Sequence, residues 1–501
     1  MTSMNNLLLV PLLVPLITGL VLFFFKERLM VTRRIAITML MVTTAVSIYL
    51  LIHVFNTKPL VINFGDWQPP FGIQFVGDTL ALFFVTIANF VVTVIIYFGF
   101  GKKEHLANRY FLPSFILFML TGVNGSFLTA DIFNLYVMFE IMLISSFVLL
   151  TLGQTLEQLR ASVIYVVMNV VSSWFFLIGI AYLYGTLGTL NFGHLAMRLA
   201  ESGQPPAMTM VAIMMIFVFG GKAALVMFMW LPKAYAALNT ELAALFAGLM
   251  TKVGVYALIR VMTLLFNHQP DITHQLMYYM AIITMIIGAV GVLGYEDVKK
   301  IAAYQVILSI GFSVLGISAL NEAGITGAIY YAGHDIIIKT LLFLVLGVFV
   351  VQCNSRSYKN MGDLIHVHPS LGIVFFILTL SIGGVPPFSG FPGKVLIIQG
   401  ALEKGYITGV VVLVLTSIIA MYSLLRIFFV MYFGREDVPR VQPVPLPLHK
   451  IIAMFLLTAA TVLMGICGEW FLDFARQAAE LNLHPSEYIK AIIPNVKVEV
   501  D

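Results

Sequence analysis

The sequence predicts an all-α, polytopic membrane protein with about 14 transmembrane helices. Of its 501 residues, 60% are apolar and 10% are charged, whereas an average soluble protein carries about 25% charged residues. The 28 basic and 24 acidic side chains are too few to solvate the surface of so long a chain. The composition therefore excludes a soluble enzyme and a disordered chain. The net charge of +4 is too small to indicate a nucleic-acid partner.

Apolar runs of about 20 residues, the length that crosses a bilayer, recur along the whole sequence. They lack the alternating pattern of barrel strands, so each is predicted to be a helix. The first run follows an N-terminus without basic residues and is predicted to be a transmembrane helix rather than a cleaved signal peptide. The runs lie near 5–25, 35–54, 80–100, 111–129, 131–151, 161–184, 208–231, 242–265, 276–294, 301–319, 325–351, 371–402, 407–433 and 451–472.

The basic residues of the loops predict the orientation. If the loop after the first helix is cytoplasmic, sixteen Lys and Arg residues fall on the cytoplasmic side, six on the opposite side and six within spans. This bias has the sign of the positive-inside rule. We therefore expect both termini on the non-cytoplasmic side.

Two of the predicted spans, the seventh and the twelfth, are broken. The run 371–402 would be about 48 Å long as a straight helix, against a hydrocarbon core of about 30 Å. Its residues 383–393 contain four glycines and three prolines, and the seventh span has Gly220-Gly221 directly before Lys222. Interrupted helices in corresponding halves of a chain are typical of a transport site at a repeat interface.

Because the lysines beside the two breaks, Lys222 and Lys394, are 172 residues apart, the sequence predicts two inverted five-helix repeats. Helices 4–8 (111–265) form the first repeat and helices 9–13 (276–433) the second. Three N-terminal helices (1–110) precede them, and a last helix with a C-terminal tail (451–501) follows.

Ionisable residues within the spans are the candidate functional residues. A charge at mid-bilayer costs about 2.5–3.5 kcal/mol, so such residues persist where they face a protein interior or a hydrated path. Four of them have no charged partner within a helical turn, which favours function, and His334 joins this group. The four are Glu140, Lys222, Lys252 and Lys394.

Other charged residues have structural explanations. Lys339 follows Asp335 by one turn, so a structural ion pair and a functional role stay equally open. Snorkelling is favoured for Arg260 and Arg426, which lie near span ends. For Asp131 and Glu241, at span starts, a favourable interaction with the helix dipole is the preferred explanation.

The chemistry that suits these residues is proton transfer. A lysine holds its proton when a carboxylate lies close and can release it when the carboxylate moves away. Hydroxyls such as Ser146, Tyr256 and Ser309, with water, could link such groups. The sequence has two cysteines and no HExxH, CxxC or phosphate-loop motif, so we expect no catalytic residue, metal site or cofactor.

Several segments resemble a known family. DIFNLYVMFE, GGKAALVMFMWLP, LMTKVGVYALIR, GHDIIIKTLLF, GGVPPFSGFPGK and EDVKKIAAYQVILSIGF are similar to segments of antiporter-like subunits. These subunits occur in the membrane arm of respiratory complex I and in Mrp-type multisubunit Na⁺/H⁺ antiporters. The length and Lys394 resemble the Mrp D subunits most. Tyr235, where complex I relatives usually have His, and the lack of a proline in 238–245 depart from the complex I pattern.

The resemblance implies a proton path. Glu140 and Lys222 would form a proton-handling ion pair, Lys252 and His334 would be relays, and Lys394 would be the terminal lysine of the second half-channel. Lys339 belongs to the same expected path.

The resemblance also implies a function. The chain would be a non-catalytic, proton-translocating core subunit of a Na⁺(K⁺)/H⁺ antiporter in a bacterial cell (plasma or inner) membrane. Its partners would be other Mrp subunits, the lipid bilayer, protons and Na⁺ or K⁺. The main alternative is a proton-pumping subunit of a complex I or membrane-bound hydrogenase type complex. A self-sufficient carrier of a small solute and a lipid-facing scaffold are further alternatives.

Overall fold

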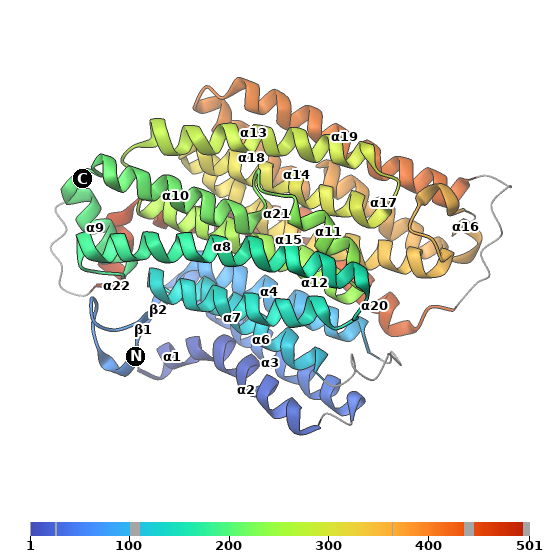
Figure 1. Ribbon diagram of the computed structural model, residues 1–501, viewed down its shortest axis with the longest axis horizontal. Helices are drawn as coiled ribbons and strands as arrows, with labels where there is room; N and C mark the ends of the chain where they lie inside the picture. The colour runs from blue at the N-terminus through green and yellow to red at the C-terminus, as the bar shows by residue number, and fades with distance from the viewer. Residues whose placement is uncertain (1, 26–27, 101–110, 363, 435–444, 494–501) are drawn as a thin grey trace.

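The computed structural model describes residues 2–25, 28–100, 111–362, 364–434 and 445–493. Figure 1 shows long helices that run side by side, close to the horizontal axis of the view. Within the described residues, twelve helices are long and apolar enough to cross a membrane, and two shorter apolar helices accompany them. The predicted class, a mostly helical polytopic membrane protein, is confirmed.

The element bounds fall into four groups along the chain. The N-terminal group contains α1 (Thr2–Asn6), η1 (Leu7–Leu9), α2 (Val10–Leu22), η2 (Phe23–Phe25), α3 (Leu29–Asn56), β1 (Leu60–Asn63), η3 (Phe64–Asp66), β2 (Gln74–Gly77) and α4 (Thr79–Phe98). The next group contains α6 (Leu112–Leu128), α7 (Ile132–Thr151), α8 (Leu156–Leu187), α9 (Phe192–Ser202), α10 (Pro206–Ala223), α11 (Trp230–Ala237) and α12 (Thr240–Leu264). The third contains α13 (Pro270–Gly294), α14 (Val298–Ala319), α15 (Glu322–Cys353), η4 (Tyr358–Asn360), α16 (Leu364–Val367), α17 (Pro369–Gly383), α18 (Gly390–Glu403) and α19 (Ile407–Phe433). The last contains α20 (Leu448–Ile466), α21 (Gly468–Leu483) and α22 (Pro485–Ile492).

Both predicted breaks are present. The first separates α10 from α11 over residues 224–229, and the second separates α17 from α18 over residues 384–389. The second break lies in a segment rich in glycine and proline, which lack a stabilising side chain or an N–H donor. Side chains donate hydrogen bonds to backbone carbonyls at both breaks.

Helices α12, α14 and α15 form the centre of the molecule. Every residue of α12 from Glu241 to Leu264 is buried. Helix α15 packs against α4, α12, α14, α18, α20 and α21. By contrast, α8 directs Trp174 and Phe175 outward, with 65% and 51% of each side chain exposed. Lys252 on α12 and Asp335 and Lys339 on α15 are therefore shielded by protein on all sides.

Two parts of the fold differ from the prediction. Strands β1 and β2 pair in antiparallel register, with Leu60 opposite Gly77, between two long helices. The strands are four residues each, too short to give a recognisable alternating pattern. The last predicted span, 451–472, is divided at Cys467: α20 ends at Ile466, α21 begins at Gly468, and α22 follows.

One basic residue assigned to the first cytoplasmic loop lies elsewhere. Arg33 is inside α3 and is 3% exposed. Its Nη2 atom lies 3.7 Å from Oε2 of Glu241 in α12, so an ion pair with another helix compensates its buried charge. Sequence alone could not show this, because the partner is about 200 residues away.

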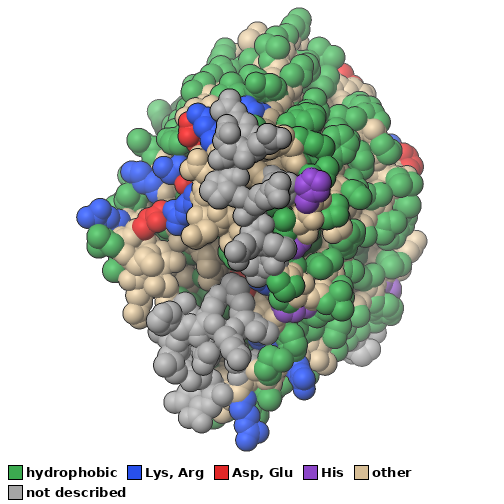
Figure 2. Space-filling model, turned by 90° about the vertical axis from the view of Figure 1, so that its right-hand side faces the viewer, with side chains coloured by type: hydrophobic (Ala, Val, Ile, Leu, Met, Phe, Trp, Pro, Cys, Tyr) green, Lys and Arg blue, Asp and Glu red, His purple; other side chains and the backbone are tan. Residues whose placement is uncertain are grey.

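Figure 2 views the end of the molecule that carries α16 and shows basic side chains at this end beside a flank covered by hydrophobic side chains. The described basic residues here include Arg356 and Lys359. Seven of the residues counted for the orientation lie outside the described residues, so the orientation stays a prediction. They are Lys26, Lys102, Lys103, Arg109, Arg435, Arg440 and Lys497.

Candidate functional site

Helix α7 carries Glu140 and begins at Asp131. The Asp131 carboxylate accepts a hydrogen bond of 2.7 Å from the backbone N–H of Asn134. A carboxylate at this position satisfies a free N–H of the first turn and interacts favourably with the helix dipole. The structural explanation of Asp131 is therefore confirmed, and the helix starts where it places Glu140 two and a half turns further in.

Glu140, Ser173 and Lys222 come together from α7, α8 and α10, and we call them the Glu140 cluster. The Ser173 hydroxyl donates to Glu140 Oε1 over 2.5 Å, and Lys222 Nζ donates to Ser173 Oγ over 3.2 Å. The resemblance implies a Glu140–Lys222 ion pair, and the structure places the Ser173 hydroxyl between these two side chains. The sequence reasoning missed Ser173, whose only sequence signal is a serine pair within an apolar span.

Lys222 is held in place by the break that follows it. It occupies the last turn of α10, where the helix dipole favours a cation. The chain then turns through Ala224 and Val226, with φ of 68° and 59°, in the left-handed region that a β-branched residue rarely adopts. The indole N–H of Trp230 donates to the carbonyl of Gly221 over 3.2 Å. A strained, well-partnered turn thus fixes the lysine side chain.

The crossing of α10 and α12 brings the backbones of the two helices into close contact near Lys222 and Lys252. A Cβ atom on Gly254 would lie 2.7 Å from the backbone nitrogen of Ala223 and 2.9 Å from the carbonyl oxygen of Phe219. Only glycine permits this close backbone approach. Lys252 and Lys222 flank the contact point, two residues and one residue away.

Asp335 is the centre of a second group, the Asp335 cluster, with Lys252, Ser309 and Lys339. Its Oδ2 atom lies 2.8 Å from Lys252 Nζ, and its Oδ1 atom lies 3.5 Å from Lys339 Nζ. The Ser309 hydroxyl donates to Oδ2 over 2.8 Å. All three charged side chains are at least 98% buried. The local Asp335–Lys339 pair considered from the sequence is present, and the same carboxylate also holds Lys252 of another helix.

His334 and Lys394 both contact the backbone or side chains at the second break, which separates α17 from α18. His334 Nδ1 and Ser389 Oγ are 2.8 Å apart, and Ser389 Oγ is 3.2 Å from Ser381 Oγ. Lys394 Nζ donates to the carbonyls of Ile382 and Gly383 over 2.8 and 3.2 Å. Because these carbonyls end α17, the ammonium group caps that helix.

Arg260 does not snorkel, as its position near a span end had indicated. It is 2% exposed and pairs with Asp78 through Nη1–Oδ2 and Nη2–Oδ1 distances of 2.6 and 2.8 Å. Tyr256 and Asn482 give further hydrogen bonds. This network ties α12 to the start of α4 and to α21, which identifies it as structural. Arg426 packs over the Tyr358 ring, with the guanidinium carbon 4.9 Å from the centroid.

Of the three hydroxyls suggested as links, one contacts a site residue. Ser309 belongs to the Asp335 cluster, whereas Tyr256 bonds to Arg260 and to the Phe127 carbonyl. Ser146 bonds to Tyr165 at 2.9 Å. In the part of the chain that the structure describes, no group of three or more His, Cys, Asp and Glu side chains could hold a metal ion.

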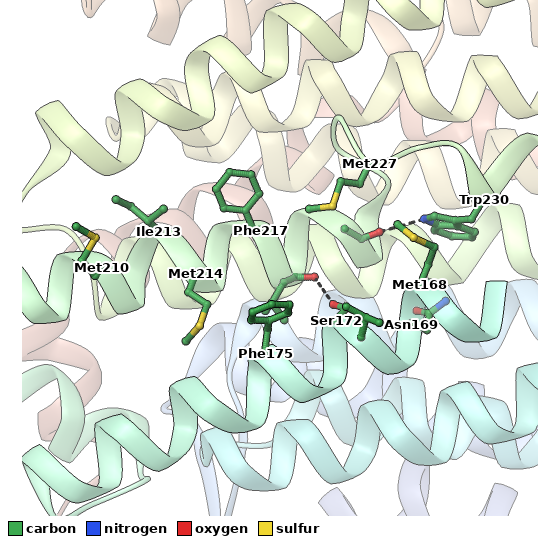
Figure 3. A pocket seen from close by; sticks show the side chains of 13 residues that line it. Met168, Asn169, Ser172, Phe175, Met210, Ile213, Met214, Phe217, Met227 and Trp230 are labelled. Carbon is green, nitrogen blue, oxygen red and sulfur yellow. Dashed lines mark hydrogen bonds between the residues drawn. The ribbon is translucent and has the colours of Figure 1, made fainter. Parts of the chain in front are cut away.

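An apolar cavity of about 480 Å³ lies between α8 and α10, beside the Glu140 cluster. Figure 3 shows Met210, Met214, Phe217 and Met227 facing Phe175 and Met168 across it. Its wall includes Ser172 and Gly221, the residues directly before Ser173 and Lys222. The cluster is thus bordered on this side mainly by apolar groups.

A known protein family matches the region of the chain that contains the two clusters. The family described as NADH:quinone oxidoreductase/Mrp antiporter, transmembrane, matches residues 129–420, the region from the start of α7 to α19. The chain belongs to this family. The match covers both helix breaks and every ionisable residue of the two clusters.

Relatives of the antiporter family are similar over the full length. A Staphylococcus aureus (strain N315) protein named antiporter subunit mnhD2 is 53% identical over 496 residues, which is 99% of this chain and 100% of that protein. The protein of the same name from strain JH9 is 52% identical over the same shares.

Solved structures share the fold. A chain of the Mrp complex from Dietzia sp. DQ12-45-1b has a TM-score of 0.91 at 27% identity, covering 98% of this chain and 100% of that one. A chain of an archaeal membrane-bound sulfane sulfur reductase has a TM-score of 0.88 at 25% identity, with the same coverage. Respiratory complex I from Thermus thermophilus shares the fold, with a TM-score of 0.82 at 22% identity over 95% of this chain and 99% of that chain.

Proposed function

We propose that this chain is the proton-translocating core subunit of a multisubunit Na⁺(K⁺)/H⁺ antiporter in a bacterial cell membrane. The observation that carries the proposal is the shared carboxylate of Asp335, which holds Lys252 of α12 and Lys339 of α15. Buried ionisable residues inside membrane helices are costly and mark ion paths. The 53% identity to a protein named as an antiporter subunit supports antiport as the activity.

The proposed path runs from Glu140 and Lys222 through Lys252 to the second half of the chain. There Lys339, His334 and Lys394 continue it to the break between α17 and α18. Two ammonium groups share one carboxylate in the Asp335 cluster, so a proton added to one lysine repels the other across a few ångströms. Such a repulsion amounts to about 4 kcal/mol at 4 Å and an effective dielectric constant of 20. Proton uptake at one end thereby favours release at the other.

The finer architecture is part of the proposal. We assign fourteen membrane helices by adding α6 and the α17–α18 pair to the long spans, and two inverted repeats, 111–265 and 276–433. The lysine beside each break supports the repeats. The units 1–110 and 451–501 complete the chain, and both termini lie on the non-cytoplasmic side.

The proposed partners are the other subunits of the antiporter, the lipid bilayer, and protons with Na⁺ or K⁺. Exposed apolar side chains on α8 and α19, such as Trp174 and Phe429, support burial of these faces in lipid or against other subunits. The subunit makes and breaks no covalent substrate bond, so it is proposed as a transporter component and not as an enzyme.

Antiport in membrane vesicles from cells that express the whole complex tests the proposal. Glu140→Gln and Lys222→Ala should abolish Na⁺- or K⁺-induced collapse of a pH gradient while the complex still assembles. Matched controls are Glu157→Gln and Lys233→Ala, which change exposed residues of the same types. Full antiport in either site variant contradicts the proposal.

The alternative, a proton-pumping subunit of a complex I or hydrogenase type complex, is favoured by one observation. The chain resembles a subunit of an archaeal respiratory membrane complex at 25% identity. Purification of the complex decides between them. Iron–sulfur subunits that copurify with the chain, together with no cation-dependent antiport, would support the alternative.

A further inference from the structure

We propose that Ser173 is the proton relay between Lys222 and Glu140, so that its hydroxyl, rather than direct contact of the two charges, controls proton exchange at the first site. The inference deepens the proposed function and rests on it. Ser173 lies on α8, at the middle of a 32-residue helix, and is 4% exposed.

The orientation of the three side chains supports a relay. Lys222 Nζ donates to Ser173 Oγ over 3.2 Å, and Ser173 Oγ donates to Glu140 Oε1 over 2.5 Å. Every donor thus faces an acceptor in one direction, from the ammonium group through the hydroxyl to the carboxylate. A hydroxyl can both accept and donate, which neither charged partner can do in its ionised form.

The proton transfer is balanced at each atom. As an N–H bond of the Lys222 ammonium breaks, its proton bonds to Ser173 Oγ. The original hydroxyl proton leaves Oγ for Glu140 Oε1. The lysine becomes neutral, the glutamate becomes a neutral acid, and Ser173 ends as the same hydroxyl. The reverse transfer restores the charged pair, and no oxidant or other co-reactant is needed.

The surroundings of the Glu140 cluster make this hydroxyl the direct link. Lys222 Nζ also lies 5.3 Å from the Phe139 ring centroid, an aromatic contact without proton-accepting capacity. The α8–α10 cavity beside the cluster is lined mainly by methionine and aromatic side chains. A mainly apolar wall offers few hydrogen-bonding partners for a bridging water.

The neighbouring serine provides a matched control. Ser172 precedes Ser173 on the same helix, but its hydroxyl donates to the Val218 carbonyl over 3.1 Å and contacts no charged group. Figure 3 shows this bond at the cavity wall. The two serines therefore differ in their role toward the Glu140–Lys222 pair while sharing residue type and helix.

The test compares antiport rates of Ser173→Ala, Ser173→Thr and Ser172→Ala in vesicles that contain the whole complex. Loss of a positioned proton-transfer group should lower the rate of Ser173→Ala by about 100-fold. Ser173→Thr keeps the hydroxyl and should restore most of the rate, and Ser172→Ala should stay within about twofold of the unmodified complex. A wild-type rate in Ser173→Ala, or a Ser173→Thr rate as low as that of Ser173→Ala, overturns the inference.

A second pair keeps the test decisive if Ser173→Ala fails to assemble. Ser173→Thr and Ser173→Val have nearly equal shapes and differ by one hydroxyl, so activity in the first and inactivity in the second support the relay. Equal rates overturn it. Failure of the proposed function is distinguished by Glu140→Gln and Lys222→Ala, because full antiport in those variants rejects the whole path, whereas their inactivity beside an active Ser173→Ala rejects only the relay.

Discussion

The Glu140 cluster and the Asp335 cluster differ in how their carboxylate and ammonium groups are arranged. The first has one carboxylate and one ammonium group separated by a hydroxyl, and its glutamate is only partly buried. The second packs two ammonium groups directly around one carboxylate, with every charged member fully buried. The first cluster can be neutral without any ion pair, whereas the second carries a charge surplus whenever both lysines are protonated.

This difference assigns separate tasks to the two clusters. A hydroxyl bridge lets acid and base exchange a proton while both stay in place. A shared carboxylate instead couples two lysines through competition, since Asp335 can neutralise one positive charge at a time. It also joins α12 to α15, and so connects the two halves of the chain at the centre of the fold.

The largest expected effect comes from Asp335→Asn. This change leaves Lys252 and Lys339 buried without a counter-charge, and removing one partner of a buried pair costs about 3–5 kcal/mol. We expect a lower unfolding temperature of the purified complex and no antiport in vesicles. Glu157→Gln, which removes a half-exposed partner of Arg356, should change stability by about 0–1 kcal/mol. An Asp335→Asn complex as stable as this control would show that the lysines need no shared carboxylate.

Substitution of Lys394 should have an intermediate effect on stability, because its ammonium group contacts carbonyl oxygens instead of a carboxylate. Lys394→Ala leaves the Ile382 and Gly383 carbonyls unpaired, at a cost of about 1–3 kcal/mol. The glutamine of Lys394→Gln can still donate a hydrogen bond to one of these carbonyls, so this variant should be more stable than Lys394→Ala. It should be equally inactive in antiport, because an amide does not take up and release a proton as an amine does. Thermal unfolding and vesicle antiport of both variants separate the two roles. Antiport in Lys394→Gln would remove Lys394 from the path.

Ser309→Ala should have the smallest effect and sharpens the comparison directly. Ser309, like Ser173, donates to a carboxylate, but Asp335 already contacts Lys252 at 2.8 Å without it. Losing this hydrogen bond should cost about 1 kcal/mol of stability and leave the antiport rate within about twofold. The same assay on Ser173→Ala provides the contrast. If Ser309→Ala lowered the antiport rate as much as Ser173→Ala does, the proposed difference between a relay hydroxyl and a supporting hydroxyl would be wrong.

The elements that could be predicted from the sequence are those with a local signal. Long apolar runs predicted the membrane helices, and glycine–proline clusters beside Lys222 and Lys394 predicted the two breaks. Lysines inside apolar runs stand out because bilayer insertion penalises them. The Asp335–Lys339 pair was visible as well, because its members are four residues apart on one helix.

The partners that the prediction lacked come from distant parts of the chain. Ser173 is 33 residues from Glu140 and 49 from Lys222. Asp78, which binds Arg260, is 182 residues away from it. A serine inside a helix often bonds to the backbone and an aspartate at a helix start often caps it, so neither residue was distinguishable from the pattern alone.

The sequence by itself determined that the chain lies in a membrane, where its helices break and which residues bring charge into the lipid core. Those properties follow from composition and local propensity, which act along a single segment. Tertiary structure decided which charges meet: it placed a hydroxyl between Glu140 and Lys222 and one carboxylate between Lys252 and Lys339. Hydrogen bonds and ion pairs act over about 3 Å, so their partners are set by how the helices pack and not by their order in the chain.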